Sequence, residues 1–337
     1  MKKNYNFLKN KSILVTGGTG SFGQQFVYEL LKNYKSINKL IIFSRDELKQ
    51  FEMSEKFSEK KFPKIRYFLG DLRDKDRIYR ALDDVDIVIH AAALKQVPKA
   101  EYDPFEYIKT NVIGSQNLIE ACLDKKVSNV ISLSTDKAAS PINLYGATKL
   151  CAEKLFIAAN NIKGSRKIKF SVVRYGNVAG SRGSVIPYFL KKKKEGVLPI
   201  TDLDMTRFNM KLEEAVSMVL WSIENNIGGE IFVPKLPSYK ILDLAKSIDQ
   251  KCKIKVVGIR PGEKIEEHLI TTAESLSCYD MGKFYSILGA KDDKIDSYYK
   301  KHYQKVKKGF SYSSSSNSKF LKINDLKKIV SEFSKKN

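Results

Sequence analysis

The 337-residue sequence is poor in cysteine, histidine and tryptophan, with four, three and one of each. The four cysteines, Cys122, Cys151, Cys252 and Cys278, are isolated and lack the close spacing of zinc ligands, so we expect no metal site. No apolar run approaches the roughly 18 residues that a membrane span needs. The basic N-terminus has no apolar core typical of a signal peptide. We therefore expect a cytoplasmic protein without a membrane partner.

Acidic residues are fewer than basic ones: 38 Asp and Glu stand against 60 Lys and Arg, giving a formal net charge of +22. A charge of this size can indicate a nucleic-acid or anionic-surface partner. However, the lysines are spread along the chain, and no basic-aromatic recognition module accompanies them. The densest block, residues 191–194, follows the apolar VIPYFL and has the pattern of a solvated helix end. We therefore expect no nucleic-acid partner.

The first half of the chain alternates short apolar runs with helical patterns. Strands are expected at 12–17, 39–44, 65–70, 86–92, 129–134 and 168–176, and helices at 24–34, at 107–125 and from 144 to about 161. Such alternation predicts an α/β fold, a doubly wound parallel (Rossmann) sheet with helices on both faces.

The alternation stops after about residue 177, which predicts a second, smaller unit. We expect residues 1–178, with 205–234 returning to them, to form the cofactor-binding domain. Residues 179–204 and 235–337 are expected to form a mixed α/β lobe that binds substrate.

A glycine-rich loop, ILVTGGTGSFGQQFV, joins the first expected strand to the first expected helix. Small residues let the turn close and let backbone N–H groups approach a pyrophosphate at the helix N-terminus. The pattern has the strand before it and the helix after it that a dinucleotide site requires. The expected cofactor contacts in this loop are Gly17, Thr19, Gly20, Ser21, Phe22 and Gly23.

The end of the second expected strand, FSRDELK, bears on which dinucleotide binds. Ser44, Arg45 and Lys49 would suit the 2′-phosphate of NADP, whereas Asp46 could bind the 2′-hydroxyl of NAD. Two cations and a hydroxyl around one acid favour NADP. His90 has the position of a hydrogen-bonded strand-end histidine. Further cofactor contacts are expected at Asp71, Leu72, Ala91 and Ala92, and later in the chain at Tyr145 and Lys149.

A tyrosine and a lysine stand four positions apart in LYGATK, after the fifth expected strand. Residues at this spacing share one face of a helix, so Tyr145 and Lys149 should lie together. Tyrosine ordinarily has a pKa near 10, and we expect the Lys149 ammonium to lower it. Tyr145 could then remove the proton of an alcohol whose carbon gives up hydride, with Thr135 sharing the hydrogen bond. Such pairs also occur on ordinary helices, but this position favours catalysis.

These motifs resemble the extended short-chain dehydrogenase/reductase superfamily, through TGGTGSFG, HAAA, KTNVIGSQN and YGATK. Within it the chain is most similar to the inverting UDP-N-acetylglucosamine 4,6-dehydratases of the pseudaminic-acid type, through SRDELKQFEMS, STDKA, RYGNVAGSRGSVIPYF, VGIRPGEK and GFSYSS. The resemblance implies an NADP-dependent lyase that converts UDP-N-acetylglucosamine into UDP-2-acetamido-2,6-dideoxy-β-L-arabino-hex-4-ulose. It also implies a homo-oligomer, either a dimer or a hexamer.

The resemblance accounts for Asp136 and Lys137, which an enzyme acting only at C4 would not need. Inverting dehydratases carry an Asp-Lys pair at this place, where retaining ones carry Asp-Glu. By this resemblance Lys137 is the base at C5, and Asp136 is the acid that helps the C6 hydroxyl leave. Tyr145 is a second candidate for returning a proton to C5. The alternative interpretation of Asp136 and Lys137 is a surface ion pair.

The nucleotide sugar carries an anionic diphosphate, which cations and backbone donors should meet. Each candidate could instead brace a loop. The candidates are Lys95, Asn177, Arg182, Arg207, Arg260 and, for a ribose hydroxyl, Glu263.

Two positions depart from the resembled family: Gln96 replaces a histidine, and Asn209 replaces a tryptophan that often follows Met-Thr-Arg-Phe. Neither departure removes an expected catalytic residue. A UDP-sugar 4-epimerase is the alternative enzyme, since it would share Tyr145 and Lys149. A cofactor-binding regulator without activity is a third hypothesis, which the intact catalytic set disfavours.

Overall fold

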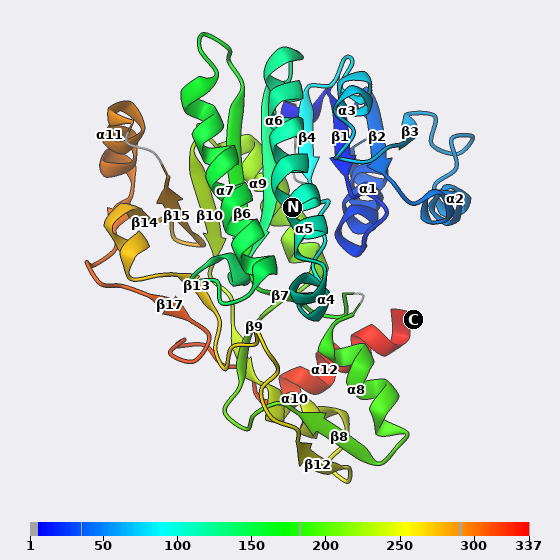
Figure 1. Ribbon diagram of the computed structural model, residues 1–337, viewed down its shortest axis with the longest axis vertical. Helices are drawn as coiled ribbons and strands as arrows, with labels where there is room; N and C mark the ends of the chain where they lie inside the picture. Colours follow the sequence, from blue (N-terminus) through cyan, green and yellow to red (C-terminus); the bar gives the residue numbers. More distant parts are fainter. Residues whose placement is uncertain (1–5, 35, 182, 290–291, 337) are drawn as a thin grey trace.

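One ten-stranded sheet forms the centre of the structure, in the order β16-β14-β15-β10-β6-β5-β4-β1-β2-β3 (Figure 1). The computed structural model describes residues 6–34, 36–181, 183–289 and 292–336. The strands are β1 (Ser12–Thr16), β2 (Lys39–Ser44), β3 (Ile65–Leu69), β4 (Ile87–His90), β5 (Asn129–Thr135), β6 (Lys169–Tyr175), β10 (Glu230–Pro234), β14 (Cys278–Asp280), β15 (Phe284–Leu288) and β16 (Gln304–Lys305).

Every neighbouring pair from β10 to β3 is parallel, whereas β15, β14 and β16 add an antiparallel edge. The strand order reverses at β1, which lies between β2 and β4. In open α/β sheets, ligands bind at such a reversal, outside the carboxyl ends of the strands. The expected doubly wound α/β fold is confirmed.

Helices cover both faces of this sheet, which is why its central strands are apolar along their whole length. The five residues of β1, SILVT, are all buried, as a parallel strand covered on both faces requires. Helix α1 packs against α9 on one face, and α6 packs against α3 and α7 on the other (Figure 1). The helices around the sheet are α1 (Ser21–Asn33), α2 (Glu47–Lys56), α3 (Lys75–Ala81), α4 (Val97–Tyr102), α5 (Pro104–Tyr107), α6 (Gly114–Asp124), α7 (Leu144–Ile162), α9 (Leu212–Asn225) and α11 (Asp293–His302).

A smaller unit with its own apolar core lies below the carboxyl ends of the strands (Figure 1). Its core includes Ile186, Leu198, Leu244 and Leu326, which come from widely separated segments. The elements of this unit are α8 (Val185–Lys193), β8 (Val197–Ile200), α10 (Ile241–Ile248), β12 (Lys253–Val256) and α12 (Ile323–Lys336). Short sheets connect it to the main body, formed by β7 (Asn177–Val178), β9 (Thr206–Met210) and β11 (Ser238–Lys240), and by β13 (His268–Ile270) with β17 (Tyr312–Ser313).

Two parts of the chain differ from the sequence-based expectation. The helix expected at 107–125 is divided, because a π-helical turn, η2 (Ile108–Ile113), precedes α6. Strands β14 to β16 belong to the main sheet, although residues 235–337 were assigned to the lobe as one block. These strands have only two to five residues each, too short for a periodic pattern to reveal.

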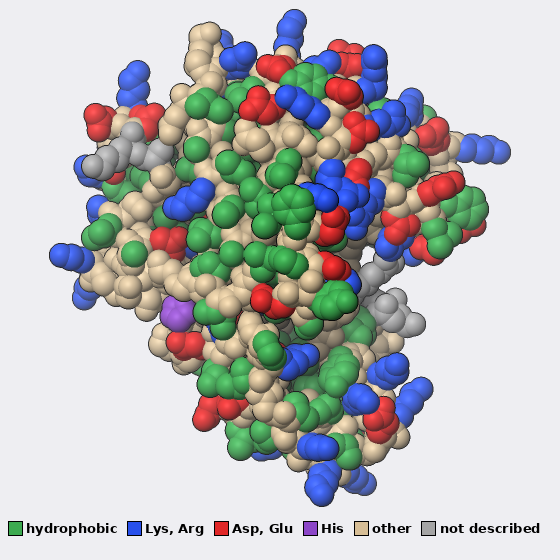
Figure 2. Space-filling model, in the orientation of Figure 1, with side chains coloured by type: hydrophobic (Ala, Val, Ile, Leu, Met, Phe, Trp, Pro, Cys, Tyr) green, Lys and Arg blue, Asp and Glu red, His purple; other side chains and the backbone are tan. Residues whose placement is uncertain are grey.

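The face shown in Figure 2 carries Lys and Arg side chains at its edges and within it, interspersed with Asp and Glu, and they do not form a continuous stripe. Within the described ranges, no helix combines the length and the apolar character that crossing a membrane would take. The same ranges contain no group of three or more His, Cys, Asp or Glu side chains arranged to hold a metal ion.

Candidate active site

A cavity of about 640 Å³ lies at the carboxyl ends of β1, β2, β4, β5 and β6. It extends from the glycine-rich loop to Asp136, Lys137 and Tyr145. All the residues expected to bind the cofactor and all those expected to be catalytic line it, and so do two of the expected substrate contacts. The lining residues expected from sequence are Gly17, Thr19, Gly20, Ser21, Phe22, Gly23, Ser44, Arg45, Lys49, Asp71, Leu72, Ala91, Ala92, Lys95, Thr135, Asp136, Lys137, Tyr145, Lys149 and Asn177.

The glycine-rich loop has the geometry of a phosphate site. Gly17 has a φ of +65°, and a Cβ there would lie 2.8 Å from the backbone of Ala92, so no larger residue fits without movement. Helix α1 starts directly after this turn, and its N-cap residue, Gly20, makes no side-chain capping hydrogen bond. Its first N–H groups and the positive end of its dipole are therefore suited to an anion.

The end of β2 brings Arg45 and Lys49 to the same cavity. The Arg45 guanidinium lies 3.9 Å from Asp71. Asp46 caps helix α2, since its carboxylate accepts a hydrogen bond of 3.0 Å from the Lys49 N–H and one of 2.5 Å from Lys49 Nζ. These hydrogen bonds hold the pKa of Asp46 below its usual value. Asp46 is thus already engaged in holding α2.

His90 takes no part in lining the cavity. Its ring bonds to Thr16 at 2.8 Å and to Ser115 at 3.2 Å, which ties β4 to β1 and α6. Burial lowers the pKa of His90 to about 3, with a smaller contribution from the Lys149 charge, so the ring stays neutral. The interpretation of His90 as a hydrogen-bonded strand-end residue is confirmed.

Asp136 and Lys137, which the sequence predicts to be catalytic, lie in a short turn, η3 (Asp136–Ala138), directly after β5. Asp136 is buried, and its Oδ1 accepts hydrogen bonds from Thr135 Oγ1 at 2.9 Å and from Lys137 Nζ at 3.0 Å. Its Oδ2 has no hydrogen-bond partner among the described residues. One carboxylate oxygen is therefore fixed by Thr135 and Lys137, and the other is left to meet a ligand.

Tyr145 and Lys149 lie in the first turns of α7, which Asn143 caps through a 2.8 Å hydrogen bond from the Gly146 N–H. Burial raises the pKa of Tyr145 to about 12, although the Lys137 charge and the Thr135 hydroxyl act to lower it. The tyrosine pKa is thus raised, not lowered as expected, and the cation that opposes the rise is Lys137.

Lys149 instead donates a 2.8 Å hydrogen bond from Nζ to the Leu133 carbonyl at the end of β5. Burial lowers the pKa of Lys149 to about 8, and Glu153 partly opposes this effect. A buried amine with a lowered pKa can exchange its proton near neutral pH.

The expected substrate contacts divide into two groups. Lys95 and Asn177 line the cavity, whereas Arg207, Arg260 and Glu263 do not. Arg207 donates to the carbonyls of Thr206, Lys264 and Ile265 at 2.7 to 3.0 Å, so it braces a loop, which was the alternative reading.

Arg260 and Glu263 form an ion pair of 2.7 Å on the same loop. Burial and the nearby Lys137 charge lower the pKa of Lys95. Arg182 lies outside the described residues.

Sequence reasoning missed several polar residues of the cavity. Thr110, Ser134 and Ser184 line it, and their buried hydroxyls have no hydrogen-bond partner in the described part of the chain. The same is true of the Asn177 side-chain oxygen. Buried polar atoms are almost always paired, so this set indicates a polar ligand in the cavity. Single Ser and Thr residues are too common for the sequence to have singled them out.

Asn111 holds the loop between β4 and α4 in place. Its side chain donates to the Leu94 carbonyl at 2.9 Å and to Thr148 at 3.0 Å, and it accepts from the Leu94 N–H at 2.8 Å. Asn111 lies in the π-helical turn η2, a distortion that often marks functional sites. Residues 91–96 are thereby tied to α7 beside the cavity.

Comparison with known proteins identifies the family of this chain. The family model of the polysaccharide biosynthesis proteins matches residues 13–288. The chain belongs to this family. It is 52% identical to the inverting UDP-N-acetylglucosamine 4,6-dehydratase of Campylobacter jejuni, over 95% of this chain and 97% of the relative. The resemblance inferred from the motifs is confirmed.

The chain is also similar to a protein named for a different activity and to a solved structure. The chain is 42% identical to a UDP-glucose 4-epimerase of Rickettsia bellii, over 95% of each chain. The X-ray structure of Pen from Bacillus thuringiensis superposes with a TM-score of 0.88 at 36% identity, over 97% of this chain and 98% of that one. Relatives that match nearly the whole chain are thus named for more than one activity.

The two departures noted in the sequence occupy different places within the family fold. Gln96 lines the cavity, and its backbone carbonyl accepts a 2.7 Å hydrogen bond from the Tyr107 hydroxyl. Asn209 is buried in β9, where its N–H donates to the Pro237 carbonyl at 2.8 Å. Gln96 alone therefore has direct access to a ligand in the cavity.

Proposed function

We propose that the protein is a UDP-N-acetylglucosamine 4,6-dehydratase that inverts C5 and forms UDP-2-acetamido-2,6-dideoxy-β-L-arabino-hex-4-ulose. The observation that carries the proposal is the meeting of Asp136 and Lys137 with Tyr145 and Lys149 at one cavity. An enzyme that only oxidises C4 needs the second pair, whereas removal of water also needs an acid and a base. The identity of 52% with an inverting dehydratase supports the same activity.

The part of the cavity beside the glycine-rich loop is assigned to NADP. When bound, it would accept hydride from C4 of the sugar and supply hydride to C6. The uncapped N-terminus of α1 and the loop at Gly17 suit its pyrophosphate. Arg45 and Lys49 suit a 2′-phosphate, because Asp46 is already engaged as the cap of α2. Titration with NADPH and NADH tests this assignment, and equal affinities would contradict it.

Tyr145 and Thr135 are assigned to the C4 hydroxyl. Tyr145 takes the hydroxyl proton, and Thr135 holds the oxygen by a hydrogen bond. Burial keeps Tyr145 protonated in the described structure, so a proton must first leave it. The Lys137 charge acts to lower the tyrosine pKa, and Lys149, whose own pKa is lowered to about 8, is assigned the exchange of protons near neutral pH.

Asp136 and Lys137 are assigned to the removal of water. Although burial acts in the opposite direction, Asp136 and Glu267 raise the pKa of Lys137, so it carries a proton in the described structure. Transfer of that proton from Lys137 Nζ to Asp136 Oδ1, across 3.0 Å, leaves a neutral amine and a carboxylic acid. These are the two forms that a C5 base and a C6 acid require. One proton transfer thus prepares both residues.

The nucleotide sugar is assigned to the other part of the cavity, away from the glycine-rich loop. Lys95, Asn177 and Ser184 line it there, and Arg260 with Glu263 would meet the outer nucleotide. Residues 1–178 and 205–234 would then hold the cofactor, and residues 179–204 and 235–337 the substrate. We further infer a cytoplasmic homo-oligomeric lyase, a dimer or a hexamer, of the pseudaminic-acid type, whose product enters the biosynthesis of a bacterial surface glycan or flagellin sugar.

Incubation of the purified protein with UDP-N-acetylglucosamine, without added reductant, tests the activity. Mass spectrometry should show loss of one water, and NMR should show a 4-keto-6-deoxy sugar inverted at C5. A product of unchanged mass that is inverted at C4 would instead identify a UDP-sugar 4-epimerase. That second candidate has support from the 42% identity to a UDP-glucose 4-epimerase.

A further inference from the structure

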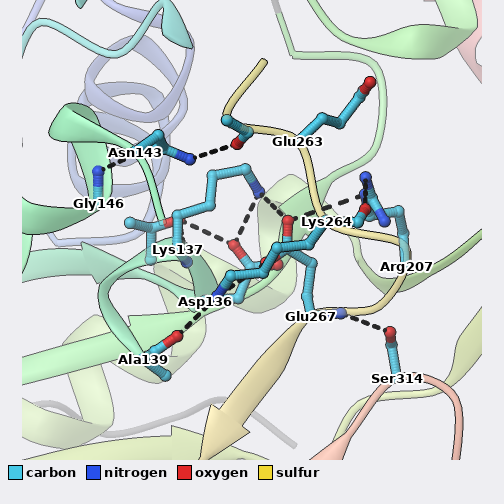
Figure 3. Close-up of polar contacts among 12 residues, drawn as sticks. Asp136, Lys137, Ala139, Asn143, Gly146, Arg207, Glu263, Lys264, Glu267 and Ser314 are labelled. Atoms are coloured by element: carbon cyan, nitrogen blue, oxygen red, sulfur yellow. Dashed lines mark hydrogen bonds and ion pairs between the residues drawn. The ribbon is translucent and has the colours of Figure 1, made fainter. Parts of the chain in front are cut away.

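Glu267 lies against the proposed catalytic lysine, although it is distant from it in the sequence. Its Oε1 is 3.2 Å from Lys137 Nζ, and its side chain is only 3% exposed. Figure 3 shows the Lys137 ammonium between two carboxylates, that of Asp136 on one side and that of Glu267 on the other. Lys137 thus bridges a residue that lines the cavity and one that does not.

The backbone of Glu267 is fixed by the C-terminal part of the chain. Its N–H donates to Ser314 Oγ at 2.9 Å, and its carbonyl accepts from the Ser314 N–H at 2.8 Å. Ser314 is itself buried and shares a 2.8 Å hydrogen bond with Thr206. Glu267 is therefore presented to Lys137 from a rigid position.

Two further cations lie near the Glu267 carboxylate (Figure 3). Arg207 Nε lies 3.9 Å from Oε1, and Lys264 Nζ lies 4.0 Å from Oε2. Oε2 is buried and accepts no hydrogen bond from any described residue. Burial of a carboxylate is costly unless cations lie close to it, and Lys137, Arg207 and Lys264 surround this one.

The loop that carries Glu267 is also attached to the catalytic turn and to α7. Lys264 Nζ donates to the Ala139 carbonyl at 2.9 Å, and Asn143 donates to the Gly262 carbonyl at 2.7 Å. These two hydrogen bonds attach the loop to Ala139 and to Asn143, which follow Lys137 in the sequence. The arrangement resists displacement of the Glu267 carboxylate when Lys137 moves a proton.

We propose that Glu267 is a positioning residue of the dehydratase, which holds Lys137 Nζ beside Asp136 and sets the charge of Lys137 during turnover. The proposal rests on the function proposed above and assigns a further residue to it. Removal of the Glu267 charge would leave Asp136 as the one carboxylate in contact with Lys137 in the described structure. The other charged or titratable groups near this pair are Lys95, Arg207, Lys264, Tyr145 and Tyr239.

Substitution E267Q in the full-length protein tests this proposal, because glutamine keeps the shape and removes the charge. Loss of a neighbouring negative charge should lower the pKa of Lys137. The part of the kcat–pH profile that reports the ionisation of Lys137 should therefore move to lower pH by about 1–3 units. KM for UDP-N-acetylglucosamine should stay unchanged, since Glu267 does not line the cavity. An unmoved profile in a folded variant would overturn the proposal, whatever the change in kcat.

Glu266 provides the matched control. It is the neighbouring carboxylate, its side chain is 39% exposed, and it lies 3.7 Å from His268 rather than beside Lys137. E266Q should leave the profile in place. A shift of equal size in E266Q would assign the effect to net charge and contradict the role of Glu267.

If E267Q does not fold, E267D takes its place, because it keeps the charge and withdraws the carboxylate by one methylene. A lower kcat with a smaller shift in the same direction supports the proposal, and wild-type values for both contradict it. Amine labelling at Lys137, followed by peptide mass spectrometry, needs no turnover. E267Q should raise the labelling rate by about 10- to 1000-fold, in line with a shift of 1–3 units. This readout remains decisive even if the wild type does not act on UDP-N-acetylglucosamine.

Discussion

Arg174 and Glu153 form an ion pair in the protein interior, with Nη2 and Oε2 2.6 Å apart and side chains that are 0% and 1% exposed. A second hydrogen bond of 2.9 Å joins Nε to Oε1, so the contact is bidentate. Glu274 binds the same guanidinium at 2.8 Å. Since Arg174 is on β6, Glu153 on α7 and Glu274 on η4 (Ala273–Ser277), the three residues join the helix of Tyr145 and Lys149 to the sheet and to the C-terminal segment.

Replacement of Arg174 by methionine should lower the free energy of unfolding by about 3–5 kcal/mol, because two carboxylates would remain without their cation. Urea unfolding of the variant measures this loss. K192M is the control: Lys192 and Glu195 form an exposed pair, with side chains 31% and 55% exposed, and its loss should leave the free energy of unfolding nearly unchanged. An equal loss of unfolding free energy in both variants would mean that the buried pair stabilises the protein no more than the exposed pair does.

Glu274 should make the protein sensitive to acid. Although burial acts in the opposite direction, the Arg174 charge and hydrogen bonds hold the pKa of Glu274 below its usual value. A carboxyl whose pKa is lower in the folded state stabilises the protein above its unfolded pKa of about 4.3. This contribution is lost as the pH falls through the folded pKa.

Unfolding measured at a series of pH values from neutral to acid checks this effect. In E274Q the free energy of unfolding should be lower at neutral pH and should fall less steeply in acid. A slope equal to that of the wild type would show that Glu274 does not contribute to it.

The sequence predicted the sheet well because its parallel strands are buried on both faces. Such strands are continuous apolar runs, as in SILVT and KLIIFS, and each stands apart from the amphipathic helices around it. Strand β14 has three residues, CYD, and gains its order from pairing with β15 rather than from a pattern of its own. Short edge strands of this kind depend on tertiary pairing that local sequence does not encode.

Cavity residues could be predicted from the sequence where they belong to a motif that lies between the end of a strand and the start of a helix. Gly17 and Tyr145 are of this kind, because the carboxyl ends of parallel strands converge at one edge of the sheet. Glu267 was not predicted: it stands beside Glu266 in EKIEEHLI, and nothing local distinguishes the buried carboxylate from the exposed one. Arg207 and Lys149 show the same limit, since their partners are backbone carbonyls set by tertiary structure.

Gly17→Ala should abolish tight cofactor binding. A Cβ at Gly17 would lie 2.8 Å from the Ala92 backbone, and the φ of +65° already disfavours alanine, so the loop must move. Titration with NADPH should show an affinity at least about tenfold weaker, the equivalent of 1.4 kcal/mol. G282A is the control, because Gly282 has a φ of +80° but no atom within 4 Å of the added Cβ. Weakened binding in both variants would indicate general backbone strain.

Substitutions at Asp136 and Lys137 should separate proton removal at C5 from loss of water. D136N keeps the shape of the side chain and removes the acid, so the rate of water loss should fall by about 10²–10⁴-fold. Lys137 remains an amine in D136N, and with one carboxylate fewer beside it its pKa should fall, because Asp136 is one of the two groups that raise it. D136N should therefore still exchange the C5 hydrogen for deuterium from the solvent.

K137M should lose that exchange together with the loss of water, because no amine remains to accept the C5 proton. NMR of the nucleotide sugar recovered from deuterated water measures exchange, and mass spectrometry measures water loss in the same samples. If K137M still exchanged at C5, the base would be a different group, and Tyr145 would be the first candidate because it lines the same cavity. If D136N lost water at nearly the wild-type rate, the proton delivered to the C6 hydroxyl would have to come from a group other than Asp136.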